Sequence, residues 1–231
     1  MHHQHSRLPA PDELMIWRFR SEWDAISKSK SPLDIRHNEQ KRAMHGPSSA
    51  LGKRYLVSRT FLRNTLSRIL DCPPIEIKLR DNAEGELQLL TPSSTPELPI
   101  RIAYAGIWVL LGISLSKLGV STALPHFHPS HSEPTDAAPY QADATQTSPA
   151  FDHLEEVRNR TLRESVIQLI GDESANRYPT LISQNGAALT AEANDGKYIH
   201  IVDLPMPGQI CAAIATYKPL STIQAFGWRG Q

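Results

Sequence analysis

The segment IRIAYAGIWVLLGISLSKLGVSTA, residues 100–123, decides the fold class of this chain. Apolar residues alternate along it, and residues 114–117, Ser-Leu-Ser-Lys, divide it into two parts. A period of two is typical of strands with one buried face. The segment therefore predicts a buried β-hairpin with its turn at residues 114–117. Neither predicted strand carries a carboxylate or a histidine.

Two further segments have the spacing of amphipathic helices. In residues 51–70, apolar side chains recur every three or four positions with arginines between them, and the prolines at 73 and 74 end the pattern. Residues 152–170 show the same spacing, with Asp152 as a predicted N-cap and Gly171 as a terminator. Both segments are predicted to be long helices.

Short apolar runs around these helices predict strands. They cover residues 13–20, 75–79, 87–90, 197–204 and 209–217, and residues 222–228 are predicted as an extra strand. Residues 27–47 are predicted to form a loop with some helix. The class is α+β, with two pseudo-symmetric halves, residues 1–123 and 151–231, each a small antiparallel sheet packed on a long helix. Residues 124–150 are rich in Pro, Ser, Thr and His and predict a flexible linker.

Composition and charge exclude several classes. Lys plus Arg and Asp plus Glu both number 24 in 231 residues, so net charge gives no general attraction to nucleic acid or to an anionic membrane. No apolar run is long enough to span a membrane, and residues 1–13 lack the apolar segment of a secretory signal. Cys72 and Cys211 have neither metal nor disulfide spacing. We expect a cytoplasmic monomer.

The order of several motifs resembles a known family. A basic helix RYLVSRTFLR, a Gly-centred hairpin, the strand start AYAG, a Gly-Val strand, the helix with RES and the final hairpin with ICAAIA follow one another along most of the chain. This order resembles a 4′-phosphopantetheinyl transferase of the surfactin-synthetase-activating type. Such an enzyme transfers the phosphopantetheine arm of coenzyme A to a serine of an acyl or peptidyl carrier protein. Its two α+β halves enclose coenzyme A and Mg²⁺.

The resemblance also shows which family residues are replaced. The Ser-His-Ser-Gly motif of the family falls on residues 103–106, which are Ala-Tyr-Ala-Gly. The Asp and Glu that follow the Gly-[Ile/Val] pair fall on Ser121 and Ala123. The helix motif falls on Arg160, Arg163, Glu164, Ser165 and Gln168, with Gln168 in place of a lysine, and the Gly-Lys-Pro turn falls on Gly85, Glu86 and Leu87. The expected metal carboxylates are therefore reduced to Glu164.

Each site residue implied by the resemblance also has a simpler interpretation. Glu164 is the implied catalytic base and metal ligand, or a surface glutamate paired with a neighbouring arginine. Coenzyme A is implied to lie against Arg54, Arg59, Tyr104 and Gly106. A buried strand tyrosine is commonly core, however, and arginines on a helix face, Arg63 included, are commonly solvated.

Two functions follow as expectations. The first is a transferase-like protein with impaired catalysis that binds a carrier protein or a synthase, because Mg²⁺ normally needs carboxylates besides the substrate phosphates. The alternative is an active transferase that uses Mg²⁺ and coenzyme A; an impaired protein requires neither. An unrelated structural role is a third, weaker hypothesis. His126, His128 and His131, and His3 near the N-terminus, have spacings that suit transition metals, but no carboxylate or cysteine framework accompanies them.

Overall fold

The first sheet holds the N-terminal strands. The computed structural model describes residues 7–21, 37–45, 48–81, 87–90, 98–125, 149–171, 180–184, 188–192 and 198–228. The first sheet has the order β11-β1-β5-β4-β3-β2. Its strands are β1 (Glu13–Arg20), β2 (Lys78–Asp81), β3 (Leu87–Leu90), β4 (Ile100–Ala105), β5 (Trp108–Ser114) and β11 (Thr222–Phe226). All its pairs are antiparallel except β1 with β11, which run parallel.

The second sheet has the order β6-β10-β9-β8-β7 and is antiparallel throughout. Its strands are β6 (Leu118–Ala123), β7 (Thr180–Gln184), β8 (Ala188–Glu192), β9 (Tyr198–Asp203) and β10 (Cys211–Thr216). The predicted α+β class is therefore confirmed. Strand membership does not follow the expected division at residue 123, because β6 joins the second sheet and β11 joins the first.

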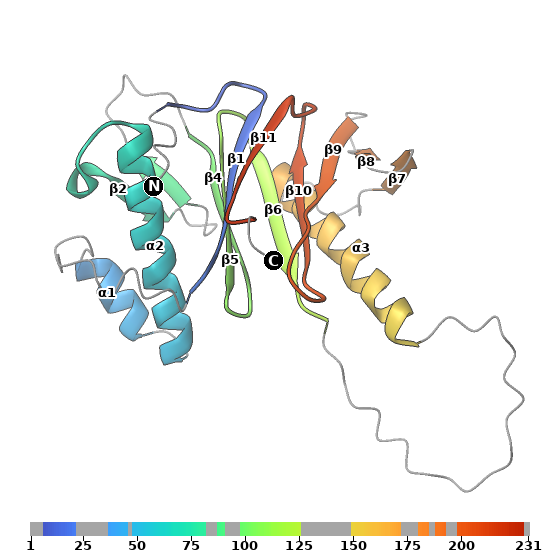
Figure 1. The fold of residues 1–231 in the computed structure, drawn as a ribbon, viewed down its shortest axis with the longest axis horizontal. Helices are drawn as coiled ribbons and strands as arrows, with labels where there is room; N and C mark the ends of the chain where they lie inside the picture. Colours follow the sequence, from blue (N-terminus) through green and yellow to red (C-terminus); the bar gives the residue numbers. More distant parts are fainter. Residues whose placement is uncertain are drawn as a thin grey trace, which may run out of the picture.

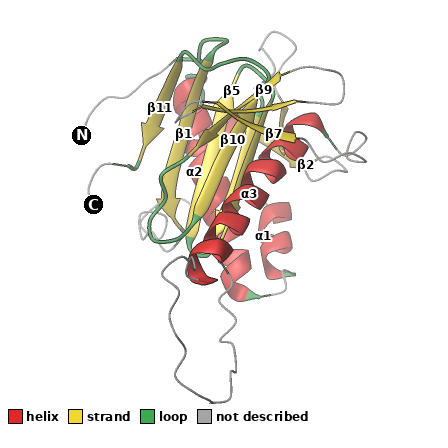
Figure 2. Ribbon diagram, turned by 90° about the vertical axis from the view of Figure 1, so that its right-hand side faces the viewer, coloured by secondary structure: helices red, strands yellow, loops and turns green. Residues whose placement is uncertain are grey.

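Three helices occur in the described residues: α1 (His37–Met44), α2 (Ser49–Ile69) and α3 (Pro149–Ile170), with a short 3₁₀ helix at Pro74–Glu76. Figure 1 shows α2 outside the first sheet and α3 outside the second, with the two sheets between them. Figure 2 looks onto the α3 side, with α2 behind the strands. No helix within the described ranges has the length and apolar character needed to cross a membrane.

Three apolar clusters hold these layers together. Val57, Leu62 and Leu66 of α2 pack on the first sheet, and Val166 and Leu169 of α3 pack on the second. A central cluster joins the sheets face to face; it contains Leu14, Ile16, Ala103, Leu110, Leu118, Val120, Leu204, Ala212 and Ile214. The strands that contribute to these clusters thus bury one face against a helix and the other against the opposite sheet.

The hairpin predicted over residues 100–123, with its turn at residues 114–117, is wrong because the segment forms three strands and the turn lies elsewhere. β4 pairs with β5 through a tight turn at Gly106 and Ile107, whereas β6 pairs with β10 in the other sheet. Gly106 has a φ of +57°, a conformation that glycine adopts without steric cost. Residues 114–117 carry the chain from one sheet to the other instead of forming a hairpin turn.

Other predictions need smaller corrections. The strand predicted at 75–79 begins only at Lys78, because the prolines start a 3₁₀ turn closed by a bond from the Ile77 amide to the Pro74 carbonyl, 3.2 Å long. The second long helix starts at Pro149, so Asp152 lies inside the helix and is not its N-cap. Strands β7 and β8 were not predicted. The strand at 13–20, the helix around 51–70 and the final hairpin are confirmed, and the extra strand predicted at 222–228 is confirmed over 222–226.

Several predictions fall outside the described residues. They concern the linker residues 126–148, the histidines at 3, 126, 128 and 131, and the turn residues Gly85 and Glu86.

Candidate functional site

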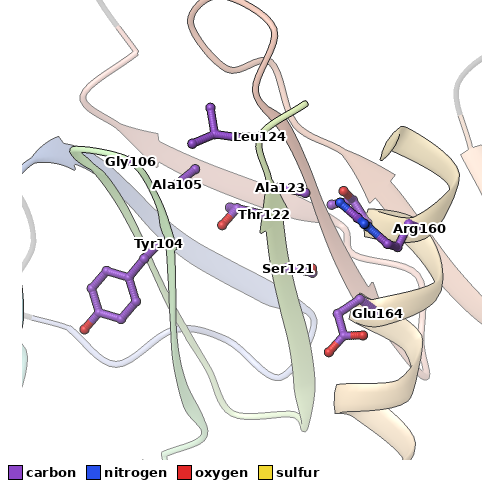
Figure 3. Close-up of a pocket in the computed structure, with 10 residues that line it drawn as sticks. Tyr104, Ala105, Gly106, Ser121, Thr122, Ala123, Leu124, Arg160 and Glu164 are labelled. Atoms are coloured by element: carbon purple, nitrogen blue, oxygen red, sulfur yellow. The ribbon is translucent and has the colours of Figure 1, made fainter. Parts of the chain in front are cut away.

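A pocket of about 380 Å³ lies where β4, β6 and α3 meet (Figure 3). Three short segments line it, and each comes from a different element: the end of β4 with its turn, the end of β6, and the middle of α3. The lining residues are Tyr104, Ala105, Gly106, Ser121, Thr122, Ala123, Leu124, Arg160, Thr161 and Glu164. Its volume is within the range of pockets that hold small molecules or cofactor fragments.

Gly119 sets the distance between β6 and α3. A Cβ atom at this position would lie 1.8 Å from the carbonyl oxygen of Ser165 and 2.9 Å from the amide nitrogen of Leu169. Only glycine therefore allows the strand to contact the helix backbone. The side-chain oxygen of Gln168 then accepts a hydrogen bond from the Val120 amide, 3.3 Å away, which fixes α3 along the free edge of β6.

Helix α2 holds the wall formed by the β4–β5 turn. Nη1 of Arg54 donates a hydrogen bond of 2.9 Å to the carbonyl oxygen of Gly106, and the Arg54 guanidinium lies 4.6 Å from the centre of the Tyr104 ring. The hydroxyls of Tyr104 and Ser58 are 2.8 Å apart and hydrogen bonded. Burial raises the pKa of Tyr104 above the usual tyrosine value, although the hydrogen bond with Ser58 opposes this shift. The phenol is therefore a neutral structural group.

The chemically reactive side of the pocket is formed by β6 and α3. Ser121 is buried and Ala123 is half-buried, while Arg160 and Glu164 project from α3 and are exposed. In Figure 3, the Arg160 side chain extends from α3 towards the end of β6, and Thr122 points to the opposite side, towards β4. The Oγ1 atom of Thr122 is buried without a hydrogen-bond partner in the described part of the chain.

These residues do not fit a magnesium site of the type implied by the resemblance. Glu164 is the one carboxylate among the residues that line the pocket. Across the described ranges, no group of three or more His, Cys, Asp and Glu side chains is arranged to hold a metal ion. Mg²⁺ favours oxygen ligands and normally takes one or two carboxylates in addition to substrate phosphates. A single exposed carboxylate is a weak anchor for such an ion.

The pocket brings together most of the residues predicted from the sequence. Tyr104 and Gly106 line it from β4 and its turn, Ser121 and Ala123 from β6, and Glu164 from α3. Arg54 contacts the pocket wall through Gly106 but is not a lining residue. The simpler interpretation of Glu164, an ion pair with a neighbouring arginine, is not realised among the described residues.

Two arginines of the basic helix have other roles than those predicted. Arg59 is buried, forms an ion pair with Asp81 of β2 and lies 4.9 Å from the Tyr55 ring, away from the pocket. Arg63 is 1% exposed and donates to both carboxylate oxygens of Glu39, at 2.8 and 2.9 Å. The expectation of a solvated arginine face is therefore wrong at both positions.

Sequence reasoning missed three lining residues: Thr122, Leu124 and Thr161. Thr122 is the important omission because its hydroxyl has no partner. Its position between Ser121 and Ala123 was a usable signal, since both neighbours were already assigned to the site.

The fold and the pocket together define an α+β protein with a ligand-sized cavity that is bordered by both sheets and a helix. No protein-family model matches the chain, and no curated protein matches it significantly.

Proposed function

We propose that this chain is a divergent member of the 4′-phosphopantetheinyl transferase superfamily that binds a carrier protein or a synthase and has impaired catalysis. One observation carries the proposal. The three segments that the resemblance assigns to the active site, on β4, β6 and α3, line a single pocket although they are up to about sixty residues apart in the chain.

The strand order supports the proposal of two pseudo-symmetric halves. The series β1-β5-β4-β3-β2 of the first sheet recurs as β6-β10-β9-β8-β7 in the second, with each strand replaced by the fifth strand after it. The long helices also occupy corresponding places in the chain. α2 lies between β1 and β2, and α3 lies between β6 and β7. Such a match of order and connection is what an internally duplicated fold requires.

The same correspondence gives a reason for the position of the pocket. Leu14 and Ile16 of β1 and Leu118 and Val120 of β6 all lie in the central cluster. Aligning these pairs places Trp17 opposite Ser121 and Phe19 opposite Ala123 in the two halves. Phe19 is in the cluster below α2, and Trp17 packs against that cluster.

The equivalent positions on β6 therefore carry small side chains where β1 carries aromatic ones. An aromatic ring fills the space between strand and helix in the first half. Serine and alanine leave that space open in the second half, and this is where the pocket lies. The replacement of carboxylates by small residues thus keeps a cavity but removes metal ligands.

Loss of the carboxylates supports impaired catalysis. Transfer of a phosphoryl-linked group needs charge neutralised on the transferring phosphate and a base near the attacking hydroxyl. In this pocket, Glu164 is the one carboxylate for both tasks, and Gln168, in place of a lysine, is engaged with the Val120 amide. We therefore propose that transfer to carrier proteins is slow or absent.

An exposed apolar side chain at the pocket supports a protein partner. Leu124 lines the pocket and is 38% exposed. An exposed apolar residue beside a ligand pocket suits a docking partner better than solvent does. We propose an acyl or peptidyl carrier protein, bound by a cytoplasmic monomer; both cysteines of the chain are free thiols, which suits a reducing compartment.

The test has two readouts on the same samples. Apo acyl and peptidyl carrier proteins are immobilised and titrated with the protein, and they are then incubated with the protein, coenzyme A and Mg²⁺ before measurement of intact mass. We expect saturable binding with little or no added phosphopantetheine mass. Ready modification that is lost in Glu164→Gln would establish the alternative, an active transferase. Absence of both binding and modification would reject the proposal.

A further inference from the structure

The pocket contains a guanidinium group that has no partner among the residues that the structure describes. Arg160 lies in the middle of α3, and its side chain extends towards the end of β6 (Figure 3). It forms no ion pair and no hydrogen bond with any residue of the described ranges, unlike Arg158 on the same helix, whose Nε donates to Asp203 over 2.7 Å. An arginine directed over a cavity offers a fork of donors that fits phosphate oxygens.

Thr122 supplies a second, independent donor group. Its Oγ1 is buried without a partner on the β4 side of β6. β6 is the edge strand of its sheet. The Val120 amide points outward from the free edge of β6 and donates a hydrogen bond to Gln168. Amides two residues apart on a strand point the same way, so the Thr122 amide is directed to the same free edge. The pocket therefore has donors on both sides of β6.

We infer that this pocket binds a diphosphate group without a divalent cation, with the Arg160 guanidinium neutralising the charge that a metal ion would otherwise neutralise. The choice of a diphosphate deepens the function proposed above and rests on it. The site itself rests on the residues of the pocket. A diphosphate has two phosphate groups, so it offers one acceptor group to Arg160 and another to Thr122, whereas orthophosphate offers a single one.

Glu164 decides between this site and a metal site. It lies one helical turn from Arg160 and lines the same pocket. In a magnesium site its carboxylate holds the ion, so its removal weakens binding of the diphosphate. In the arginine site the carboxylate repels the ligand, so its removal strengthens binding. The same variant thus gives opposite results for the two arrangements.

The experiment is isothermal titration calorimetry of the full chain with inorganic pyrophosphate in buffer that contains EDTA. We expect saturable binding that is tighter than binding of orthophosphate. Arg160→Gln should weaken it about tenfold or more, in line with the loss of charge-assisted hydrogen bonds. Glu164→Gln should tighten it, and Thr122→Val should weaken it a fewfold. Arg68→Gln is the matched control, because Arg68 is an exposed arginine on α2 that does not line this pocket.

Opposite results would overturn the inference. These are no binding at millimolar pyrophosphate, binding that requires Mg²⁺, weaker binding by Glu164→Gln, or equal losses in Arg160→Gln and Arg68→Gln. Arg160 and Glu164 are both exposed, so their variants should fold, and thermal unfolding followed by circular dichroism checks this. No carrier protein is present in the titration. Failure of carrier binding would therefore reject the proposed function and leave the diphosphate site standing, and the reverse holds as well.

Discussion

Replacement of Gly119 by alanine tests whether close contact between β6 and α3 builds the pocket. The new Cβ would lie 1.8 Å from the Ser165 carbonyl oxygen and 2.9 Å from the Leu169 amide nitrogen, and both of these atoms belong to the helix backbone. Ordinary contacts between such atoms are about 3.5 Å or longer. The strand and the helix must therefore separate by roughly 1.5 Å or distort, since no side chain can rotate away.

The cost of this separation follows from what α3 buries. Leu169 and Val166 are fully buried between α3 and the second sheet, and both lose contacts when the helix moves outward. Overpacking of a core costs about 1–3 kcal/mol, and occasionally more where the backbone itself is in the way. We expect Gly119→Ala to lower the free energy of unfolding by about 3 kcal/mol and to weaken pyrophosphate binding, because Arg160 moves with α3.

Gly112→Ala is the matched control for this prediction. Gly112 is also a buried strand glycine, but an added Cβ would meet the Leu118 Cδ1 atom at 2.9 Å and the Val120 Cγ2 atom at 3.3 Å, both at side-chain ends that can shift. The gain from reduced flexibility of the unfolded chain is the same for both substitutions. We expect a loss of about 1 kcal/mol or less for the control.

Urea unfolding followed by circular dichroism at 25 °C measures both variants by linear extrapolation. The expected difference between them is about 2 kcal/mol, well above the error of the method. Equal stabilities, or a loss below about 0.5 kcal/mol for Gly119→Ala, would refute the argument that this glycine is required by backbone contact.

Three further predictions concern the pocket and the core. The double substitution Ser121→Asp with Ala123→Glu should create Mg²⁺ binding measurable by calorimetry and raise carrier-protein modification in the intact-mass assay; unchanged values in both would contradict the assignment of these positions. Arg63→Ala should cost about 3–5 kcal/mol in urea unfolding because it leaves the buried Glu39 carboxylate unpaired, whereas replacing both by apolar residues (Arg63→Met with Glu39→Leu) should cost much less. Burial raises the pKa of Tyr104, so the stability that its neutral form contributes is complete below pH 10 and is lost as the pH rises through the folded-state pKa; Tyr104→Phe should flatten this alkaline decline, and an unchanged pH profile would count against it.

Local patterns in the sequence predicted the elements more reliably than their pairing. The helix spacing of residues 51–70 and the prolines after it are local signals, and α2 ends at Ile69 as expected. The turn at Gly106 was missed because apolar alternation continues on both sides of it, so that two strands read as one. The partner of β6 is β10, about ninety residues away in the chain, and no local pattern specifies such a pairing.

The site was predictable only in the part that local sequence motifs mark. Motif order identified positions on β4, β6 and α3 that line one pocket. It misjudged Arg59, whose burial depends on an ion pair with Asp81, a residue on a strand that follows the helix in the chain. The unsatisfied hydroxyl of Thr122 also has no sequence signature, because the partners of a buried hydroxyl depend on the groups that the fold places around it.

The charges of the pocket connect the absence of the family carboxylates to the arginine on α3. In the family pattern, three carboxylates, one divalent cation and the lysine at the position of Gln168 together are neutral beside the ligand phosphates. Here Glu164 and Arg160 together are neutral, and no metal is needed to reach that state. In the proposed site, Glu164 without Arg160 would leave the ligand phosphates uncompensated, and Arg160 beside a bound Mg²⁺ would place two cations in repulsion. Arg160 without these carboxylates therefore suits metal-free diphosphate binding, and the carboxylates without Arg160 suit Mg²⁺ binding. Arg160→Gln, and Ser121→Asp with Ala123→Glu, should each weaken the first and strengthen the second.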